Sequence, residues 1–270
     1  MGGKLAHVAP NVDTLIEALP YIREFRGETF VIRCEAGLSE EQRDALCRDI
    51  AMLRFVGVKT VLVHPAEVDG AGDERRRDNH RLVHGIGAFG NATGLSGGDG
   101  APRWLLSISD DGTLSANVDL VEHVIDDYTP VIEAVAVGPD GDARAADADL
   151  AAARLAIALG AYKLLLVVGS DRVRIVDGER RGTVSEMRAS EDVLAKLAAP
   201  PPLAGALQAG RLAVENAVTF AHLLPSDVAH SLLLELFTNA GYGTKIRSRE
   251  SWASAGRDGV GYETWEQVAA

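Results

Sequence analysis

Charged side chains follow two short apolar runs that have the composition of buried strands. Arg33 and Glu35 come after the first run, and His64 and Glu67 come after the second. Two carboxylates that flank a cleft can do acid–base chemistry if burial raises the pKa of one of them. A carboxylate in such a loop also repels a phosphate group. The two loops therefore argue against phosphate binding and leave acid–base work as an alternative.

Lysine, the usual partner of phosphate in glycine-rich loops, is scarce in this chain. Of the 27 Lys and Arg residues only five are lysines. None of the five follows a strand into a glycine-rich turn, which is the usual position of a phosphate-binding lysine. The sequence thus argues against ordinary ATP-dependent phosphotransfer. The five lysines are Lys4, Lys59, Lys163, Lys196 and Lys245.

Three further patterns have a catalytic or ligand-binding spacing but lack the context that the chemistry requires. The stretch 94–98 fits the G-x-S-x-G nucleophile elbow, but a turn with a proline follows where a helix must begin. His80 and His84 stand four apart on a predicted helix, and no third zinc ligand accompanies them. Cys34 stands beside an arginine, yet a buried and inert thiol is the commoner state of such a cysteine. We expect no metal site.

The elements that must position these residues alternate between strand and helix signals. Ser39 and Gln42 form a capping-box pattern, and Asp177-Gly178 marks a hairpin turn between runs at 173–176 and 183–186. Apolar strands joined by helices of about 10–15 residues predict a mainly parallel sheet covered on both faces. The predicted strands are 29–32, 60–63, 92–95, 104–108, 131–136, 163–168 and 219–224, and the predicted helices are 11–25, 76–88, 117–127, 147–159, 190–198, 203–217 and 227–237.

The composition is that of an acidic globular chain. With 39 Asp and Glu against 27 Lys and Arg, the net charge is −12 over 270 residues. This charge argues against a surface that holds nucleic acid or an anionic membrane. Two cysteines make no disulfide framework, and no apolar run reaches the ~18–20 residues of a membrane span. We expect a cytoplasmic protein with one large α/β domain or two smaller lobes.

Several phrases in this order of elements resemble the arginine-sensitive N-acetylglutamate kinases. The resemblance covers roughly 11–247 and implies the amino-acid kinase fold, an α/β three-layer αβα sandwich with a mainly parallel central sheet. Members bind N-acetylglutamate toward one end and ATP toward the other. The implied divisions are a kinked N-terminal oligomerisation helix at 1–26, an amino-acid kinase-like domain at 27–249 and a C-terminal tail at 250–270. The phrases are 15–23, 94–100, 158–164, 232–238 and 243–244.

The resemblance also implies that the phosphotransfer machinery is degraded. The family's lysine after the first strand is Arg33 here, which keeps the charge but not the compact ammonium. A proline and Glu67 interrupt the glycine cradle after the second strand, and Ala206 stands where a lysine would bridge ATP. The organising aspartate is kept as Asp149. The vestigial catalytic residues are therefore Arg33 and Asp149, and the substrate cleft contains His64, Glu67 and Gly97.

The family's regulatory segment is better preserved than its catalytic loops. In arginine-sensitive members the inhibitor lies between the kinked N-terminal helix and the C-terminal strand–helix segment. A carboxylate there can take a guanidinium bidentately. The same helix pairs dimers into hexamers, and its apolar stripe is intact here. Carried over, the arginine-binding residues are Tyr21, His222, Glu235, Gly241 and Gly243, while simple packing and a salt bridge are the alternative roles of the first three.

The function that follows is that of a pseudokinase with a regulatory role in arginine biosynthesis. It would bind a small amino-acid ligand, arginine being the best match, without a cofactor. It would act as a homo-oligomer, a dimer or hexamer, or with an active paralogous enzyme. The alternative is an enzyme of the same fold with altered chemistry on an acylated amino acid such as N-acetylglutamate, and only this alternative would use MgATP. A third possibility is a structural subunit whose pockets bind nothing.

Overall fold

The computed structural model describes most of the chain between residues 9 and 247. The described residues are 9–66, 72–169, 176–177, 180–181, 186–188, 201–238 and 243–247. Glu67, Gly241, the helix expected at 190–198 and the tail expected at 250–270 lie outside them. Within the described residues, no helix combines the length and the apolar composition needed to cross a membrane.

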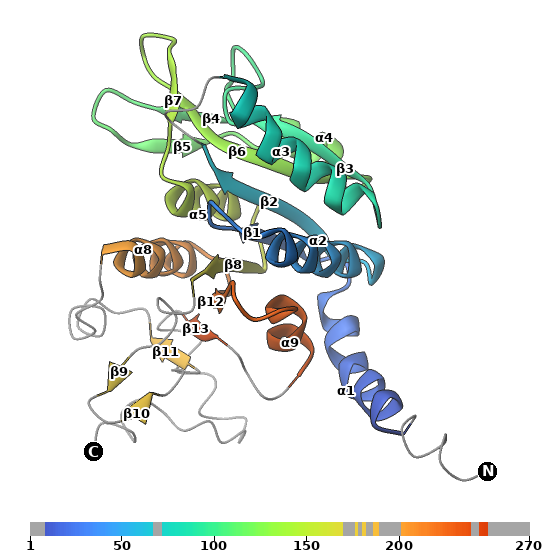
Figure 1. Ribbon diagram of the computed structural model, residues 1–270. Coiled ribbons are helices and arrows are strands. Elements are labelled where there is room, and N and C mark those ends of the chain that lie inside the picture. The colour runs from blue at the N-terminus through green and yellow to red at the C-terminus, as the bar shows by residue number, and fades with distance from the viewer. Residues whose placement is uncertain are drawn as a thin grey trace.

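An eleven-stranded sheet built from the described residues forms the centre of the molecule (Figure 1). Its main path runs β11–β13–β12–β8–β1–β2–β6–β4–β5, and β3 and β7 also pair with β6. The central pairs β12–β8, β8–β1, β1–β2 and β2–β6 are parallel, which confirms the mainly parallel sheet. The strands are β1 (Thr29–Arg33), β2 (Lys59–Pro65), β3 (Ala92–Ser96), β4 (Leu106–Ile108), β5 (Leu114–Ala116), β6 (Thr129–Val137), β7 (Ala143–Ala145), β8 (Lys163–Val168), β11 (Glu186–Arg188), β12 (Phe220–Pro225) and β13 (Thr244–Arg247).

Helices cover both faces of the sheet. Helices α5 and α8 contact each other and lie on one face, while α2, α3 and α9 lie on the other. Helix α1 contacts α9 and extends away from the body of the molecule (Figure 1). The three-layer sandwich is therefore confirmed. The helices are α1 (Ala9–Phe25), α2 (Glu40–Phe55), α3 (Gly72–Gly87), α4 (Asp119–Val124), α5 (Ala148–Ala158), α8 (Pro201–Glu215) and α9 (Ser231–Phe237).

Two hydrophobic cores result from the alternation of side chains along each strand. In β1, Val31 belongs to the core beneath α5 and α8, whereas Ile32 belongs to the core beneath α2, α3 and α9. Both side chains are fully buried. Strands buried on both faces have no polar side to present, which is why the central strands read as unbroken apolar runs.

The capping box predicted at the start of α2 is present. The Gln42 backbone N–H donates to Ser39 Oγ over 3.2 Å, and the Ser39 N–H donates to Gln42 Oε1 over 2.8 Å. These reciprocal bonds satisfy donors that the first turn of a helix leaves without partners. The helix therefore begins directly after the short loop that follows β1.

The sequence prediction missed several short elements and misplaced others. It did not foresee β5, β7 or β13, because strands of three or four residues give no measurable periodicity and β7 is exposed along its length. The expected turn residue Asp177 instead lies in β9 (Val176–Asp177), where it pairs with Arg180 of β10 (Arg180–Arg181). The last helix starts at Ser231 and not at residue 227.

Candidate functional site

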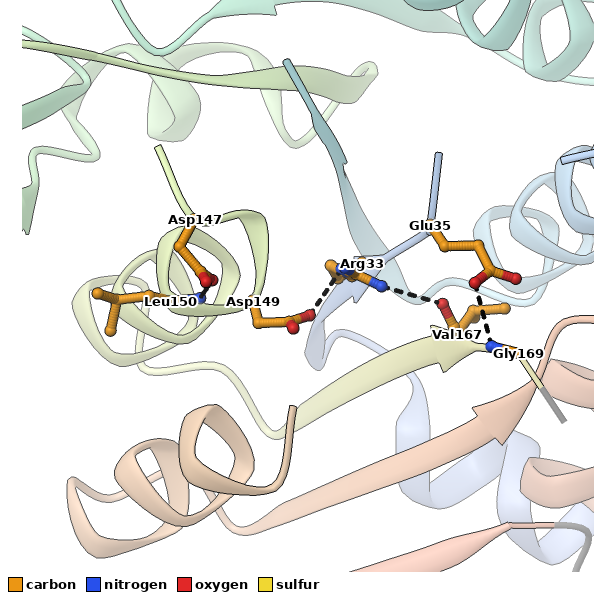
Figure 2. Close-up of polar contacts among 7 residues, drawn as sticks. All are labelled: Arg33, Glu35, Asp147, Asp149, Leu150, Val167 and Gly169. Atoms are coloured by element: carbon orange, nitrogen blue, oxygen red, sulfur yellow. Dashed lines mark hydrogen bonds and ion pairs between the residues drawn. The ribbon is translucent and has the colours of Figure 1, made fainter. Parts of the chain in front are cut away.

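The cation at the end of β1 is held by a carboxylate from α5. Arg33 Nε lies 2.7 Å from Asp149 Oδ1, and the two side chains are only 9% and 11% exposed. Arg33 Nη1 also lies 3.5 Å from the Val167 carbonyl oxygen, its acceptor. Figure 2 shows the guanidinium lying between α5 and β8. Arg33 is therefore part of a buried ion pair and is not turned toward an open cleft.

The first turn of α5 fixes the position of that carboxylate. Asp147 is the N-cap residue of α5, and its Oδ1 accepts from the Leu150 N–H over 2.8 Å. Asp149 lies within the same turn, so its side chain projects toward the end of β1 (Figure 2). A carboxylate in the first turn also has a favourable interaction with the helix dipole.

Glu35 contacts Gly169, just after the end of β8 (Figure 2). Its Oε2 accepts from the Gly169 backbone N–H over 3.1 Å, and its Oε1 accepts a short hydrogen bond from the Ser226 hydroxyl. These bonds join the chain that follows β1 to the carboxyl ends of β8 and β12. A backbone N–H that could receive an anion at this edge of the sheet is therefore already occupied by a carboxylate.

His64 and Gly97 lie on either side of β6, and both have structural roles. Asn79 Nδ2 lies 3.1 Å from His64 Nε2, and His64 Nδ1 lies 3.1 Å from the Pro65 carbonyl oxygen. Burial lowers the pKa of His64, so the neutral ring donates from Nδ1 and accepts at Nε2. A Cβ on Gly97 would lie 1.9 Å from the Val135 carbonyl oxygen, so only glycine fits there.

A second cluster forms where β12, α9 and the start of β13 meet. Glu235 Oε1 lies 2.9 Å from His222 Nδ1, and Glu235 Oε2 accepts from the Gly243 N–H over 3.0 Å. The His222 and Glu235 side chains are 4% and 6% exposed. Burial lowers the pKa of His222 to about 4 despite the carboxylate, so the ring is neutral and donates from Nδ1. Its buried Nε2 has no hydrogen-bond partner among the described residues and is available as an acceptor.

Lys163, at the start of β8, lies in a group of aromatic rings beside this cluster. Its Nζ is 4.9 Å from the ring centroid of Phe25, 5.3 Å from that of Tyr162 and 4.6 Å from that of Phe220. Burial, with a further effect from Lys245, lowers the pKa of Lys163 to about 7. The described residues provide cation–π contacts to this amine but no carboxylate within ion-pairing distance.

The structure therefore brings Tyr21, His222, Glu235 and Gly243 into one region. Tyr21 of α1 packs on Phe25 with ring centroids 6.2 Å apart, and Phe25 contacts Phe237 of α9 at 6.0 Å. Sequence reasoning missed Lys163, which it considered only as a phosphate ligand. The available signal was a lysine that opens an otherwise apolar strand. A carboxylate, a neutral imidazole acceptor and a buried amine together suit a zwitterionic ligand with a cationic side chain.

Cys34, among the described residues, is not a reactive centre. Burial raises the pKa of the Cys34 thiol to about 12, so this thiol is protonated and a poor nucleophile. Among the described residues, no group of three or more His, Cys, Asp or Glu side chains is arranged to hold a metal ion.

Curated proteins similar to this chain are acetylglutamate kinases. The acetylglutamate kinase of Kosmotoga olearia is 30% identical over 282 residues, which cover 88% of this chain and 98% of the relative. The acetylglutamate kinase of Synechococcus sp. strain CC9311 is 32% identical, with 87% of this chain and 96% of the relative covered. No protein-family profile matches the chain.

Solved structures share the fold at lower sequence identity. N-acetylglutamate synthase from Neisseria gonorrhoeae, complexed with coenzyme A and N-acetylglutamate, has a TM-score of 0.71 at 22% identity. The match covers 87% of this chain and 63% of the synthase, so this chain spans less than two thirds of that protein. The synthase complexed with coenzyme A and L-arginine gives a TM-score of 0.65, with 87% and 65% covered. Carbamate kinase from Giardia lamblia bound to AMP-PNP gives 0.59 at 14% identity, with 82% and 99% covered.

Proposed function

The chain belongs to the acetylglutamate kinase family, and we propose that it is a pseudokinase that binds arginine as a regulatory subunit. The observation that carries this proposal is a contrast between two sites. The charged groups that follow β1 are engaged, Arg33 by Asp149 of α5 and Glu35 by the Gly169 N–H, while the acceptors and the amine beneath α1 match the polar groups of an amino acid.

The edge of the sheet beyond β1 is poorly suited to phosphate. MgATP is the cofactor that the family implies, and phosphoryl transfer relies on cations and backbone N–H groups placed around the moving group. Here Arg33 is neutralised by Asp149 over 2.7 Å, and Glu35 already occupies the Gly169 N–H. A polyphosphate at this edge would have to displace one carboxylate and approach another. These residues fit MgATP poorly, and we derive no catalytic step through it.

The groups beneath α1 match an amino acid with a guanidinium side chain. The guanidinium of arginine has five N–H donors, which match the Glu235 carboxylate and the His222 Nε2 acceptor. The α-carboxylate of the same ligand would give Lys163 the anionic partner that the described residues do not supply. The neutral state of His222 is required, because a protonated ring would repel the guanidinium. The L-arginine complex of the Neisseria synthase, a protein of the same fold, supports this choice of ligand.

We further propose that α1 mediates assembly, with a second copy or with an active paralogous enzyme. Ile16 and Leu19 of α1 are 58% and 53% exposed, although both are large and apolar. Because α1 also carries Tyr21 and Phe25, a ligand beneath it would change how this helix is presented to a partner. Arginine binding and assembly would then be coupled.

Calorimetry with arginine, N-acetylglutamate and MgATP tests the proposal. We expect arginine to bind wild-type protein, and Glu235→Gln to lose that binding while Glu215→Gln, an exposed control on α8, keeps it. Tight MgATP binding with turnover of N-acetylglutamate would overturn the pseudokinase assignment. Failure of arginine to bind would overturn the ligand assignment.

An enzyme with altered chemistry on an acylated amino acid is the second candidate. It would draw its acid and base from Glu35 and a second carboxylate in the neighbouring loop. Glu35 is held by the Gly169 N–H and the Ser226 hydroxyl, so each of its oxygens already accepts a hydrogen bond within the protein. A carboxylate engaged in this way is poorly placed to take a proton from a substrate, so the structure gives this candidate no specific support.

A further inference from the structure

Large apolar side chains are exposed together where α2 and α3 end. Among the described residues, six large apolar side chains are exposed, and two of them belong to α1. The others lie near the ends of α2 and α3 and just before β6, and Phe55, the last residue of α2, is 86% exposed. Single exposed apolar residues are common, but a contiguous group marks an interaction surface. The four are Met52, Phe55, Phe89 and Tyr128.

Three of these side chains and one arginine share a surface. Arg48, Met52 and Phe55 are spaced four and three residues apart, so they lie on one face of α2. The Arg48 Cζ atom lies 5.6 Å from the centroid of the Phe89 ring, which brings the turn after α3 onto this face. We call Arg48, Met52, Phe55 and Phe89 the α2 patch.

The α2 patch carries positive charge on a chain whose net charge is −12. Arg48 is exposed, and the part of the chain that the structure describes places no carboxylate within ion-pairing distance of it. Arg54, beside the patch, donates to the Ile125 and Asp126 carbonyl oxygens over 2.6 and 2.8 Å. The α2 patch therefore matches a segment that combines aromatic rings with carboxylates.

The chain itself contains such a segment beyond β13. Tyr262 and Trp265 stand three residues apart, a spacing at which two rings can meet one surface. Glu263 and Glu266 follow them directly, and residues 258–270 include no lysine or arginine. The apolar and the acidic character of this segment both complement the α2 patch.

The end of β13 lies within reach of the α2 patch. Strand β13 is antiparallel to β12, so Arg247 lies at the edge of the sheet where β12, β8, β1 and β2 begin. Helix α2 ends at the same edge, because β2 follows it directly. Four strand spacings of about 4.8 Å, roughly 19 Å in all, separate β13 from β2. Residues 248–262 can span up to about 50 Å when extended.

We propose that the α2 patch binds residues 262–268 of the same chain, with Tyr262 and Trp265 against Phe55 and Phe89 and the glutamates beside Arg48. Attachment through a short linker gives such a segment an effective concentration of about millimolar, so a weak contact is enough to hold it. The bound segment covers the apolar surface and keeps it from associating with other chains. None of these residues takes part in the proposed arginine site, so the two proposals stand or fall separately.

Hydrogen exchange of the full chain, followed by mass spectrometry, tests this docking. We expect the amides of residues 262–268 to exchange about tenfold or more slowly than in a free peptide of the same sequence. Phe55→Ser removes an exposed side chain, so the fold should persist while this slow exchange is lost. Leu19→Ser, which removes an exposed apolar side chain from α1, is the matched control and should leave it unchanged. Equal exchange in the wild type and the peptide, or slow exchange unaffected by Phe55→Ser, would overturn the proposal.

A disulfide identifies which chain supplies the segment. Met52→Cys/Val268→Cys adds two thiols and keeps the aromatic side chains, and the chain's own Cys34 and Cys47 are buried. We expect mild oxidation to give a disulfide within one chain, seen as a monomer on a non-reducing gel with a mass two hydrogens lower. Leu19→Cys/Val268→Cys is the control and should not form it. A disulfide that joins two chains would assign the α2 patch to a second copy and overturn the intramolecular docking.

Discussion

Asp49 of α2 and His230, the residue before α9, are in contact through Oδ1 and Nδ1 at 2.6 Å. Asp49 is 2% exposed and also accepts hydrogen bonds from the backbone N–H groups of Leu232 and Leu233. His230 itself makes no side-chain capping bond to α9. A carboxylate from α2 therefore caps the helix that carries Glu235.

Replacing this cap should destabilise the fold. Asp49→Ala leaves the first N–H groups of α9 without their acceptor, and loss of a cap costs about 0.5–2 kcal/mol. We expect urea unfolding at neutral pH to show a lower midpoint and arginine binding to weaken, because α9 positions Glu235. Asp44→Ala, at an exposed position of the same helix, is the control and should change stability by less than about 0.5 kcal/mol. Identical midpoints for the two variants would rule out the capping role.

Lys163 should make stability depend on pH in the alkaline range. Burial lowers its pKa from 10.5 to about 7, so the folded state favours the neutral amine. The resulting stabilisation is fully present above about pH 10.5 and is lost as the pH falls toward 7. Lys163→Met removes this dependence, so it should be more stable than wild type at pH 7 and lose that advantage as the pH rises. Thermal unfolding across this range measures the difference, with Lys59→Met, 40% exposed, as the control.

Arginine binding should be accompanied by proton uptake at Lys163. At pH 8 the amine in the free protein is mostly neutral, because its pKa lies near 7. A carboxylate brought beside it favours the charged form and raises that pKa. Calorimetry in two buffers of different ionisation enthalpy should detect the uptake of a fraction of a proton, up to about one. Uptake that persists in Lys163→Met would place the linked proton elsewhere.

Breaking the Arg33–Asp149 pair should lower the free energy of unfolding. Replacing Arg33 by the family's lysine should not restore catalysis. Arg33→Met leaves a buried carboxylate without this partner, and such a change costs about 3–5 kcal/mol. The double variant Arg33→Met/Asp149→Leu should cost less than the single one, which urea unfolding can compare. Arg211→Met breaks a more exposed pair on α8 and should cost less than about 1 kcal/mol. Arg33→Lys should give no measurable turnover of MgATP with N-acetylglutamate.

The fold could be predicted because its signals are local. Ser39 and Gln42 stand three residues apart, and their capping box marks the start of α2 from the sequence alone. The apolar runs of β1, β2 and β8 likewise predict buried parallel strands, and the resemblance to a known family supplies their order. The short strands β5 and β7 were missed because too few residues repeat for a period to appear.

The sites were harder to predict because their contacts are distant in sequence. The sequence showed that Arg33 stands where the family has a lysine. The pairing of Arg33 with Asp149 depends on how α5 packs, which the sequence does not show. The position of Lys163 among three rings follows from the approach of α1 to β8 and β12, which no spacing encodes.

The central position of β1 sets the order in which the chain can complete its fold during synthesis. Arg33 on β1 reaches Val167 on β8, 134 residues later, and at about 5–20 residues per second this part of β8 is made roughly 7–27 s after its neighbour. Until then one edge of β1 is open on the ribosome, where such edges invite association with other chains. The contact between Asp49 and His230 can form only later still, because His230 lies 181 residues beyond Asp49. The amino-terminal half therefore keeps these groups without their partners until the strands and the helix at its other end have emerged.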